Sequence, residues 1–167
     1  MMFHWSRFSG GMPGRSSDYI NVEIMAAAAA ADFYSQNDPR FGENARNYYE
    51  HARENDLCMT HTLVNPQSNR ALTAGGHPSA DVALRIVDEN ADGMVVRGAR
   101  ILATLGPLAD EIMVFPSTVL KAASDTKSFA FAFTIPCATP GMKFICRESL
   151  AYGESPVDHP LSSRFEE

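Results

Sequence analysis

The chain has 167 residues, of which 45% are hydrophobic and 20% are charged, and its formal net charge is −6 at pH 7. This length and composition predict an ordinary globular domain and exclude a disordered or fibrous chain. The acidic balance, with no cluster of Lys and Arg in the sequence, argues against a nucleic acid as the main partner.

Cysteine usage and hydropathy bear on the compartment. Cys58, Cys137 and Cys146 form neither a Cys-x-x-Cys pair nor the dense, even pattern of secreted mini-domains. No apolar run approaches the roughly 20 residues that cross a bilayer, and residues 1–15 lack the apolar core of a signal peptide. We therefore expect a cytoplasmic protein with no membrane association.

Two helices are predicted in the first third of the chain. Ser17 suits an N-cap, and apolar residues follow it at a spacing near 3.6, which predicts a helix over Asp18–Gln36. The sequence Asn37-Asp38-Pro39 should end this helix, because the residue before a proline is biased away from helical backbone. A second helix is predicted over Glu43–Leu57, so that residues 1–57 form a helical region.

The remaining residues, 58–167, have the pattern of a β domain. Asp81–Val87 and Met94–Arg97 read as a hairpin joined by the turn Asn90–Gly93. Further strands are predicted at Arg100–Leu105, Glu111–Phe115, Phe129–Pro136 and Lys143–Arg147. Helices followed by short strands predict an α+β fold with a small antiparallel sheet or barrel.

The segment Asn55–Arg70 carries the strongest local signal for a binding site. Its loop, Asn65–Arg70, combines amide and hydroxyl groups with one arginine and a proline that favours a turn, which suits an anionic or polar ligand. An ordinary helix-to-strand connection with a solvated arginine is the simpler reading of these residues alone. His61 stands just before the loop, and an imidazole titrates near neutrality, which suits either a base or a structural histidine.

Other candidates stand at the ends of predicted elements. Arg15 and Tyr19 are four residues apart, so in a helix they would share a face and could clamp an oxyanion or a phenolic hydroxyl. Packing of the arginine stem on the tyrosine ring is the simpler alternative. Thr104, before a Gly-Pro turn, and the pair Ser117-Thr118 place hydroxyls at strand ends.

Several longer runs together resemble one family. They are Gly14–Tyr19, Asn55–His61 with Asn65–Gln67, Val96–Glu111, Val114–Pro116, Ile135–Cys137 and Thr139–Glu148. In this order along nearly the whole chain, they resemble the flavin-dependent phenol hydroxylases of the 4-hydroxyphenylacetate 3-monooxygenase oxygenase family.

The resemblance implies a fold like that of acyl-CoA dehydrogenases, in which N-terminal helices precede a β-barrel middle domain. It implies a two-component enzyme that takes reduced FAD from a separate flavin reductase and uses O2 to hydroxylate a small phenol ortho to its hydroxyl group. It also implies a homo-oligomer in the full-length form, and no metal.

Residue roles follow from the same resemblance. Arg15, Tyr19 and His61 would bind the phenolic hydroxyl and act in catalysis, and Ser117 and Thr118 would hold the far end of the substrate. The flavin contacts would be His61, Thr62, Leu63, Gln67, Ser68, Asn69, Arg70 and Thr104.

Three alternatives stay open. Family members continue into a large C-terminal helical domain, so this shorter chain is expected to lack it and could be an inactive fragment that acts only as a flavin-binding or interaction module. A relative of 4-hydroxybutyryl-CoA dehydratase would need cysteine ligands on the early helix, where this chain has Arg15 and Tyr19. The phenol itself, whether 4-hydroxyphenylacetate, a chlorophenol or a tyrosine-like compound, is not fixed by these residues.

Overall fold

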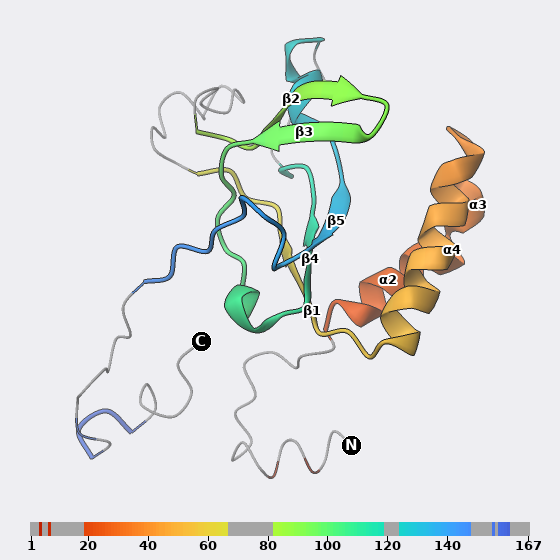
Figure 1. Cartoon of the computed structure of the whole chain (residues 1–167). Coiled ribbons are helices and arrows are strands. Elements are labelled where there is room, and N and C mark those ends of the chain that lie inside the picture. The colour runs from red at the N-terminus through yellow and green to blue at the C-terminus, as the bar shows by residue number, and fades with distance from the viewer. Residues whose placement is uncertain are drawn as a thin grey trace. The chain divides into compact units, whose positions relative to one another are not determined.

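Helices come first along the chain and strands follow (Figure 1). The computed structural model describes residues 4, 7, 19–66, 82–118, 124–147, 155 and 157–160. The helices are α2 (Asn21–Ala29), α3 (Ala31–Tyr34) and α4 (Pro39–Glu54), the strands are β1 (Met59–Thr62), β2 (Arg85–Asn90), β3 (Gly93–Arg97), β4 (Glu111–Val114) and β5 (Phe133–Pro136), and the 3-10 helices are η1 (Gly106–Leu108) and η2 (Ser124–Phe129). The predicted α+β class is confirmed at this level.

The chain divides into two compact units, and each is described separately. One unit comprises Met1–Leu57 and Pro140–Glu167, and the other comprises Cys58–Thr139. The α-helices α2, α3 and α4 belong to the first unit, and the strands β1 to β5 belong to the second. In the described part of the chain, no helix is both long enough and apolar enough to span a bilayer.

Helix α4 begins four residues earlier than the sequence predicted, at Pro39 instead of Glu43. The carboxylate of Asp38 accepts a hydrogen bond of 2.9 Å from the backbone N–H of Arg40, so Asp38 is the N-cap and Pro39 is the first helical residue. Proline suits that position because its missing N–H would have no partner there and its φ is already helical. The hydrogen bonds from Arg40 also hold the pKa of Asp38 below its ordinary value. The same residues that end one helix therefore start the next.

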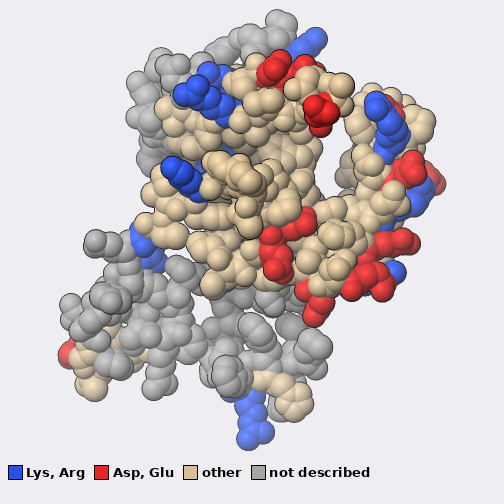
Figure 2. All heavy atoms as spheres, viewed as in Figure 1, with Lys and Arg blue, Asp and Glu red and all other residues tan. Residues whose placement is uncertain are grey.

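The first predicted helix, Asp18–Gln36, is in fact two shorter helices. Tyr19 and Ile20 form a turn, α2 begins at Asn21, and Ala30 leaves helical geometry with φ −93° and ψ 16° before α3 begins. Alanine side chains are small and make few contacts that would hold one long helix together. Packing against other elements therefore determines where the helix breaks. An ion pair of 2.5 Å from Arg46 on α4 to Asp32 on α3 lies on their exposed surface, where basic and acidic groups alternate (Figure 2).

Gly42 on α4 lies against the backbone of α3. It is buried, and a β-carbon built on it would collide with the side-chain oxygen of Ser35 and the carbonyl oxygen of Ala31. Ser35 in turn donates a hydrogen bond of 3.0 Å to that same carbonyl. Only a residue without a β-carbon allows this close approach of the two helices.

Gly42→Ala should therefore destabilise the helical unit, although alanine favours a helix by about 1 kcal/mol over glycine. Overpacking against backbone should cost about 1–3 kcal/mol, which urea denaturation followed by circular dichroism would measure. Asn47→Ala, at an exposed position of the same helix, is the matched control and should be neutral or slightly stabilising. A more stable Gly42→Ala variant would contradict the close approach.

The three-stranded sheet has the order β1-β4-β5. Strand β4 pairs in parallel with β1, from Met59 opposite Glu111 to Thr62 opposite Val114, and antiparallel with β5. The prediction of a purely antiparallel sheet is therefore wrong for its central pair. The described residues form this sheet and a separate hairpin of β2 and β3, without a closed barrel.

Three strand predictions fail in detail. Residues 100–105 make only a single bridge at Ile101, because Leu102 and Leu105 have left-handed backbone, with φ 63° and 62°, which breaks a strand. The predicted strand Phe129–Pro136 is half right, since Phe129 ends η2 and β5 begins at Phe133. Residues 143–147 form no strand among the described residues.

The hairpin prediction is confirmed. β2 and β3 pair antiparallel around the turn Asn90–Gly93, and the irregular register between Ile86 and Asp88 adds a bulge. Gly93 has a φ of 136°, which only glycine adopts readily. The turn was predictable because the sequence Asn-Ala-Asp-Gly supplies both side-chain acceptors and this glycine.

Asp110 connects the starts of β1 and β4 to the end of β5. Its carboxylate accepts a hydrogen bond of 2.8 Å from the backbone N–H of Cys58, and its own N–H donates to the Cys58 carbonyl at 2.8 Å. Its carbonyl accepts another, also of 2.8 Å, from the N–H of Cys137. Burial, and then the Asp110 carboxylate, raises the pKa of both thiols above the ordinary value.

Alkylation by iodoacetamide should distinguish these thiols. A raised pKa leaves less thiolate at a given pH, so at pH 8 Cys58 and Cys137 should react more slowly than the exposed Cys146. Asp110→Asn should lower both pKa values and speed their alkylation, as mass spectrometry of the labelled peptides would show. Asp92→Asn, on the exposed hairpin turn, should change neither rate, and equal rates for all three cysteines in the unmodified protein would refute the assignment.

Candidate functional site

The candidate site is built around β1, which has two neighbours. It pairs with β4, and the pairing continues where the N–H of Phe115 donates to the Thr62 carbonyl at 2.9 Å. Just beyond β1, the segment 101–104 is bridged to the chain where the N–H of Ile101 donates to the Val64 carbonyl at 2.9 Å. Although β1 is the outer strand of its sheet, Met59, Thr60 and Thr62 are all buried.

Two threonine hydroxyls fasten the segment 101–104 to β1. Thr62 donates a hydrogen bond of 3.1 Å to the carbonyl of Ile101, and Thr60 donates a short hydrogen bond to the carbonyl of Thr104. These bonds compensate carbonyls that leave the sheet where the backbone turns at Leu102 and Leu105. The result is that Thr62 and Thr104, two predicted flavin contacts, belong to one tightly connected piece of structure.

His61 lies within β1, just before the loop that begins at Asn65. Its side chain is half-buried, and its ring meets the ring of Phe115 edge-on, with centroids 6.4 Å apart. In a strand, successive side chains alternate between faces, so His61 points away from the face that Thr60 and Thr62 share. The imidazole is thus held by the sheet and by an aromatic ring, which restricts its orientation.

The other predicted site residues of the second unit vary in exposure. Leu63 and Thr104 are half-buried, Ser117 is buried and Thr118 is exposed. Thr104 immediately precedes the left-handed Leu105 and the 3-10 helix η1, so the Gly-Pro turn seen in the sequence is present.

Some predicted site residues cannot be compared with the structure. Arg15 and the loop residues Gln67, Ser68, Asn69 and Arg70 lie outside the described residues. Tyr19 is half-buried in the turn before α2, and it belongs to the helical unit, whereas His61 belongs to the β unit. The predicted clamp of Arg15 and Tyr19 on successive turns of a helix is not supported at Tyr19, which precedes the helix.

The structure adds two polar residues to which the sequence assigned no role of their own. The three guanidinium nitrogens of Arg100 and the Oδ1 of Asn65 are buried without a hydrogen-bond partner among the described residues. Burial also lowers the pKa of Arg100 below its ordinary value. A polar ligand would supply hydrogen-bond partners for these buried donors and acceptors. This part of the chain is therefore compatible with a bound flavin. A sequence pattern does not show burial, and this signal was therefore missed.

Comparison with known proteins decides the family. The family model described as 4-hydroxyphenylacetate 3-hydroxylase N terminal matches residues 1–167. The chain belongs to this family. The resemblance found in the sequence is thereby confirmed.

Two relatives are the 4-hydroxyphenylacetate 3-monooxygenase oxygenase components of Geobacillus sp. (strain PA-9) and Thermus thermophilus. The chain is 56% identical to the first and 50% identical to the second, each over 163 residues and 98% of this chain. These matches cover 33% and 32% of the two relatives. The chain thus spans about a third of the length of the curated relatives it matches.

Solved structures agree with the family assignment. A crystal structure of the oxygenase component of 4-hydroxyphenylacetate 3-monooxygenase, complexed with FAD and 4-hydroxyphenylacetate, is similar with a TM-score of 0.79 and 50% identity over 98% of this chain and 33% of that one. An archaeal 4-hydroxybutyryl-CoA dehydratase from N. maritimus is similar in fold alone, with a TM-score of 0.62 and 17% identity over 73% of this chain and 24% of that one.

Thr60→Val tests the attachment of Thr104 to β1. Valine keeps the shape of the buried side chain but leaves the Thr104 carbonyl without its donor, which should cost about 1–3 kcal/mol in the free energy of unfolding. Urea denaturation would measure the loss. Thr134→Val on β5 is the matched control, because the Thr134 hydroxyl has no hydrogen bond to any described residue, and it should be nearly neutral. Equal effects of the two substitutions would show that the Thr60 bond does not stabilise the site.

Proposed function

We propose that this chain is the N-terminal part of a flavin-dependent aromatic monooxygenase that hydroxylates a small phenol, such as 4-hydroxyphenylacetate, ortho to its hydroxyl group. The observation that carries the proposal is the 50% identity, over 98% of the chain, to an oxygenase component crystallised with FAD and 4-hydroxyphenylacetate. The hydrogen bonds that attach the segment 101–104 to β1, from Thr60 to the Thr104 carbonyl and from Thr62 to the Ile101 carbonyl, support it because Thr62 and Thr104 are both predicted flavin contacts.

The residues would divide the work as follows. The segment 61–63, the loop 67–70 and Thr104 hold the flavin, which supplies the oxidising chemistry once it is reduced and meets O2. Tyr19 and Arg15 bind the phenolic hydroxyl. His61 accepts the proton of that hydroxyl, which favours the more nucleophilic phenolate. The buried Ser117 and the exposed Thr118 hold the far end of the substrate.

The wider organisation is part of the same proposal. Residues 1–57 form the helical region and 58–167 the middle domain, whose strands close into a barrel in the complete protein. The bridge from Val64 to Ile101 supports this, since it connects the segment that follows β1 to the segment that follows β3, and these strands belong to different sheets. Reduced FAD comes from a separate flavin reductase, and the complete protein is a homo-oligomer. Three cysteines without a disulfide suit a reducing cytoplasm.

A second reading is that the 167 residues alone bind flavin without hydroxylating a phenol. Its support is the share of the relatives that the chain covers, 33% and 32%, because catalysis needs a complete and preorganised site. This reading and the first make different predictions for turnover but the same prediction for flavin binding.

Anaerobic titration with reduced FAD tests the proposal. The chain should bind reduced FAD saturably, with the quenching of protein fluorescence as the readout. His61→Asn should lower the rate of phenol hydroxylation by about 10²–10⁴-fold, the usual contribution of a general base. The rates are compared at saturating reduced FAD, because His61 is also a proposed flavin contact.

His51→Asn, on the exposed surface of α4, is the control and should change neither quantity. Flavin binding without product would favour the second reading. Failure of the chain to bind reduced FAD at all would refute both.

A further inference from the structure

Two half-buried side chains near β1, Asn65 and Arg100, have buried polar atoms and share one place in the fold. Asn65 follows Val64, and Arg100 precedes Ile101, so both flank the antiparallel bridge between Val64 and Ile101 on the same side. Antiparallel pairing brings such positions opposite each other. The orphaned Oδ1 of Asn65 and the three orphaned nitrogens of Arg100 therefore belong to one site.

Among the described residues, none accepts a hydrogen bond from the guanidinium of Arg100. Its guanidinium lies over the ring of Phe131, 5.7 Å from the centroid, and that ring stacks on Phe133 with centroids 5.7 Å apart. An aromatic face attracts a cation but accepts none of the five in-plane N–H groups of arginine. A buried charge with unmade hydrogen bonds is costly, which points to an acceptor that arrives with a ligand.

The backbone around Arg100 holds it firmly in this position. The N–H of Ala99 donates to the Val82 carbonyl at 2.8 Å, and the N–H of Leu84 donates to the Ala99 carbonyl at 3.1 Å. Gly98, with φ 125°, permits this approach, because a β-carbon there would lie 2.5 Å from the Ala83 carbonyl oxygen. Arg100 is thus fixed between bridges on both sides, which favours a preorganised contact.

The pair of side chains defines the chemistry of the occupant. A guanidinium fork requires two neighbouring acceptors, and an Asn Oδ1 requires a donor next to them. The pyrimidine edge of a flavin has this order, with N1 and the C2 carbonyl as acceptors and N3–H as the adjacent donor. In the reduced flavin that edge also carries negative charge when N1 is deprotonated. One cation among aromatic rings suits this flat, singly charged edge better than a pyrophosphate, which requires several donors.

We propose that Arg100 and Asn65 bind the pyrimidine edge of the flavin, with Arg100 donating to N1 and the C2 carbonyl and Asn65 accepting from N3–H. This assignment rests on the proposed flavin function and adds two positioning residues to it. It gives the protein a preference for the reduced cofactor, since only the reduced edge is charged.

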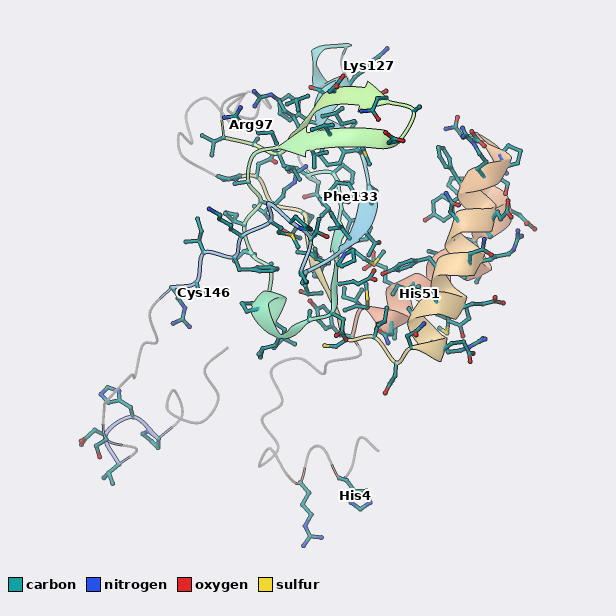
Figure 3. All side chains as sticks on the ribbon, in the orientation of Figure 1. His4, His51, Arg97, Lys127, Phe133 and Cys146 are labelled. Atoms are coloured by element: carbon teal, nitrogen blue, oxygen red, sulfur yellow. The ribbon has the colours of Figure 1, made fainter. Side chains whose placement is uncertain are left out.

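The test compares anaerobic affinities for FAD and for riboflavin, each oxidised and reduced, in the unmodified chain, Arg100→Met and Asn65→Leu. Arg100→Met should weaken the binding of reduced FAD and of reduced riboflavin equally, by about tenfold to a hundredfold, and should weaken the binding of the oxidised forms less. Asn65→Leu should weaken the binding of the flavin in both redox states by about tenfold. Arg97→Met, which removes the same charge from an exposed position on β3 (Figure 3), should leave all four affinities unchanged.

A modified ligand separates the role of Asn65 from a general loss of shape. 3-Methylriboflavin lacks the N3–H donor, so the unmodified chain should bind it more weakly than riboflavin, whereas Asn65→Leu should bind the two equally. Arg100→Lys keeps the charge but loses the fork, and it should fall between the unmodified chain and Arg100→Met.

Three results would overturn the assignment. If Arg100→Met lost affinity for FAD but not for riboflavin, Arg100 would bind the phosphate groups of FAD and not the flavin ring. A ligand-free Arg100→Met variant with a lower Tm would mean that a carboxylate of this chain already neutralises the arginine, whereas the proposal expects a Tm no lower than that of the unmodified chain. Unchanged flavin affinity in both variants would refute this inference alone, whereas no flavin binding by the unmodified chain would refute the proposed function with it.

Discussion

The attachment of β1 to two neighbours is the constraint on which the site depends. β1 pairs with β4 along the sheet, and just beyond β1 the carbonyl of Val64 accepts a hydrogen bond from the segment 101–104. The threonine hydroxyls at 60 and 62 make the second attachment possible, because that segment is too irregular to form a regular ladder. His61, Asn65, Arg100 and Thr104 all take their positions from these two attachments.

The sequence allowed the prediction of features that depend on interactions between residues close together in the chain. The β2–β3 hairpin was predictable because its turn residues and its glycine are adjacent in the chain. The early start of α4 also had a local cause, the Asp38-Pro39 cap, although the proline was read as the end of one helix and not as the start of another. The break at Ala30 could not be predicted, because it accompanies the contact of Ala31 with Gly42, which lies in the following helix.

The topology of the three-stranded sheet was not predicted correctly, because it depends on pairing between strands that are far apart in the chain. Alternating apolar residues predict a strand but not the direction of its partner, so the parallel alignment of β1 with β4 was not foreseen. For the site, the family resemblance supplied the roles of Arg15, Tyr19, His61 and Thr104, whereas the residues alone left simpler readings open for each. Burial of polar atoms is a property of the folded chain, which is why Asn65 and Arg100 emerged only from the structure.

The parallel pairing of β1 with β4 also sets an order of events during folding. Residues 63–110 separate the two strands, so this central pair has a high sequence separation and must close a long loop before it gains its hydrogen bonds. The β2–β3 hairpin lies within that loop and closes through a short turn, on the microsecond scale typical of hairpins. The pairing of β1 with β4 therefore cannot be completed until Val114 has been synthesised, and we expect it to form after the hairpin.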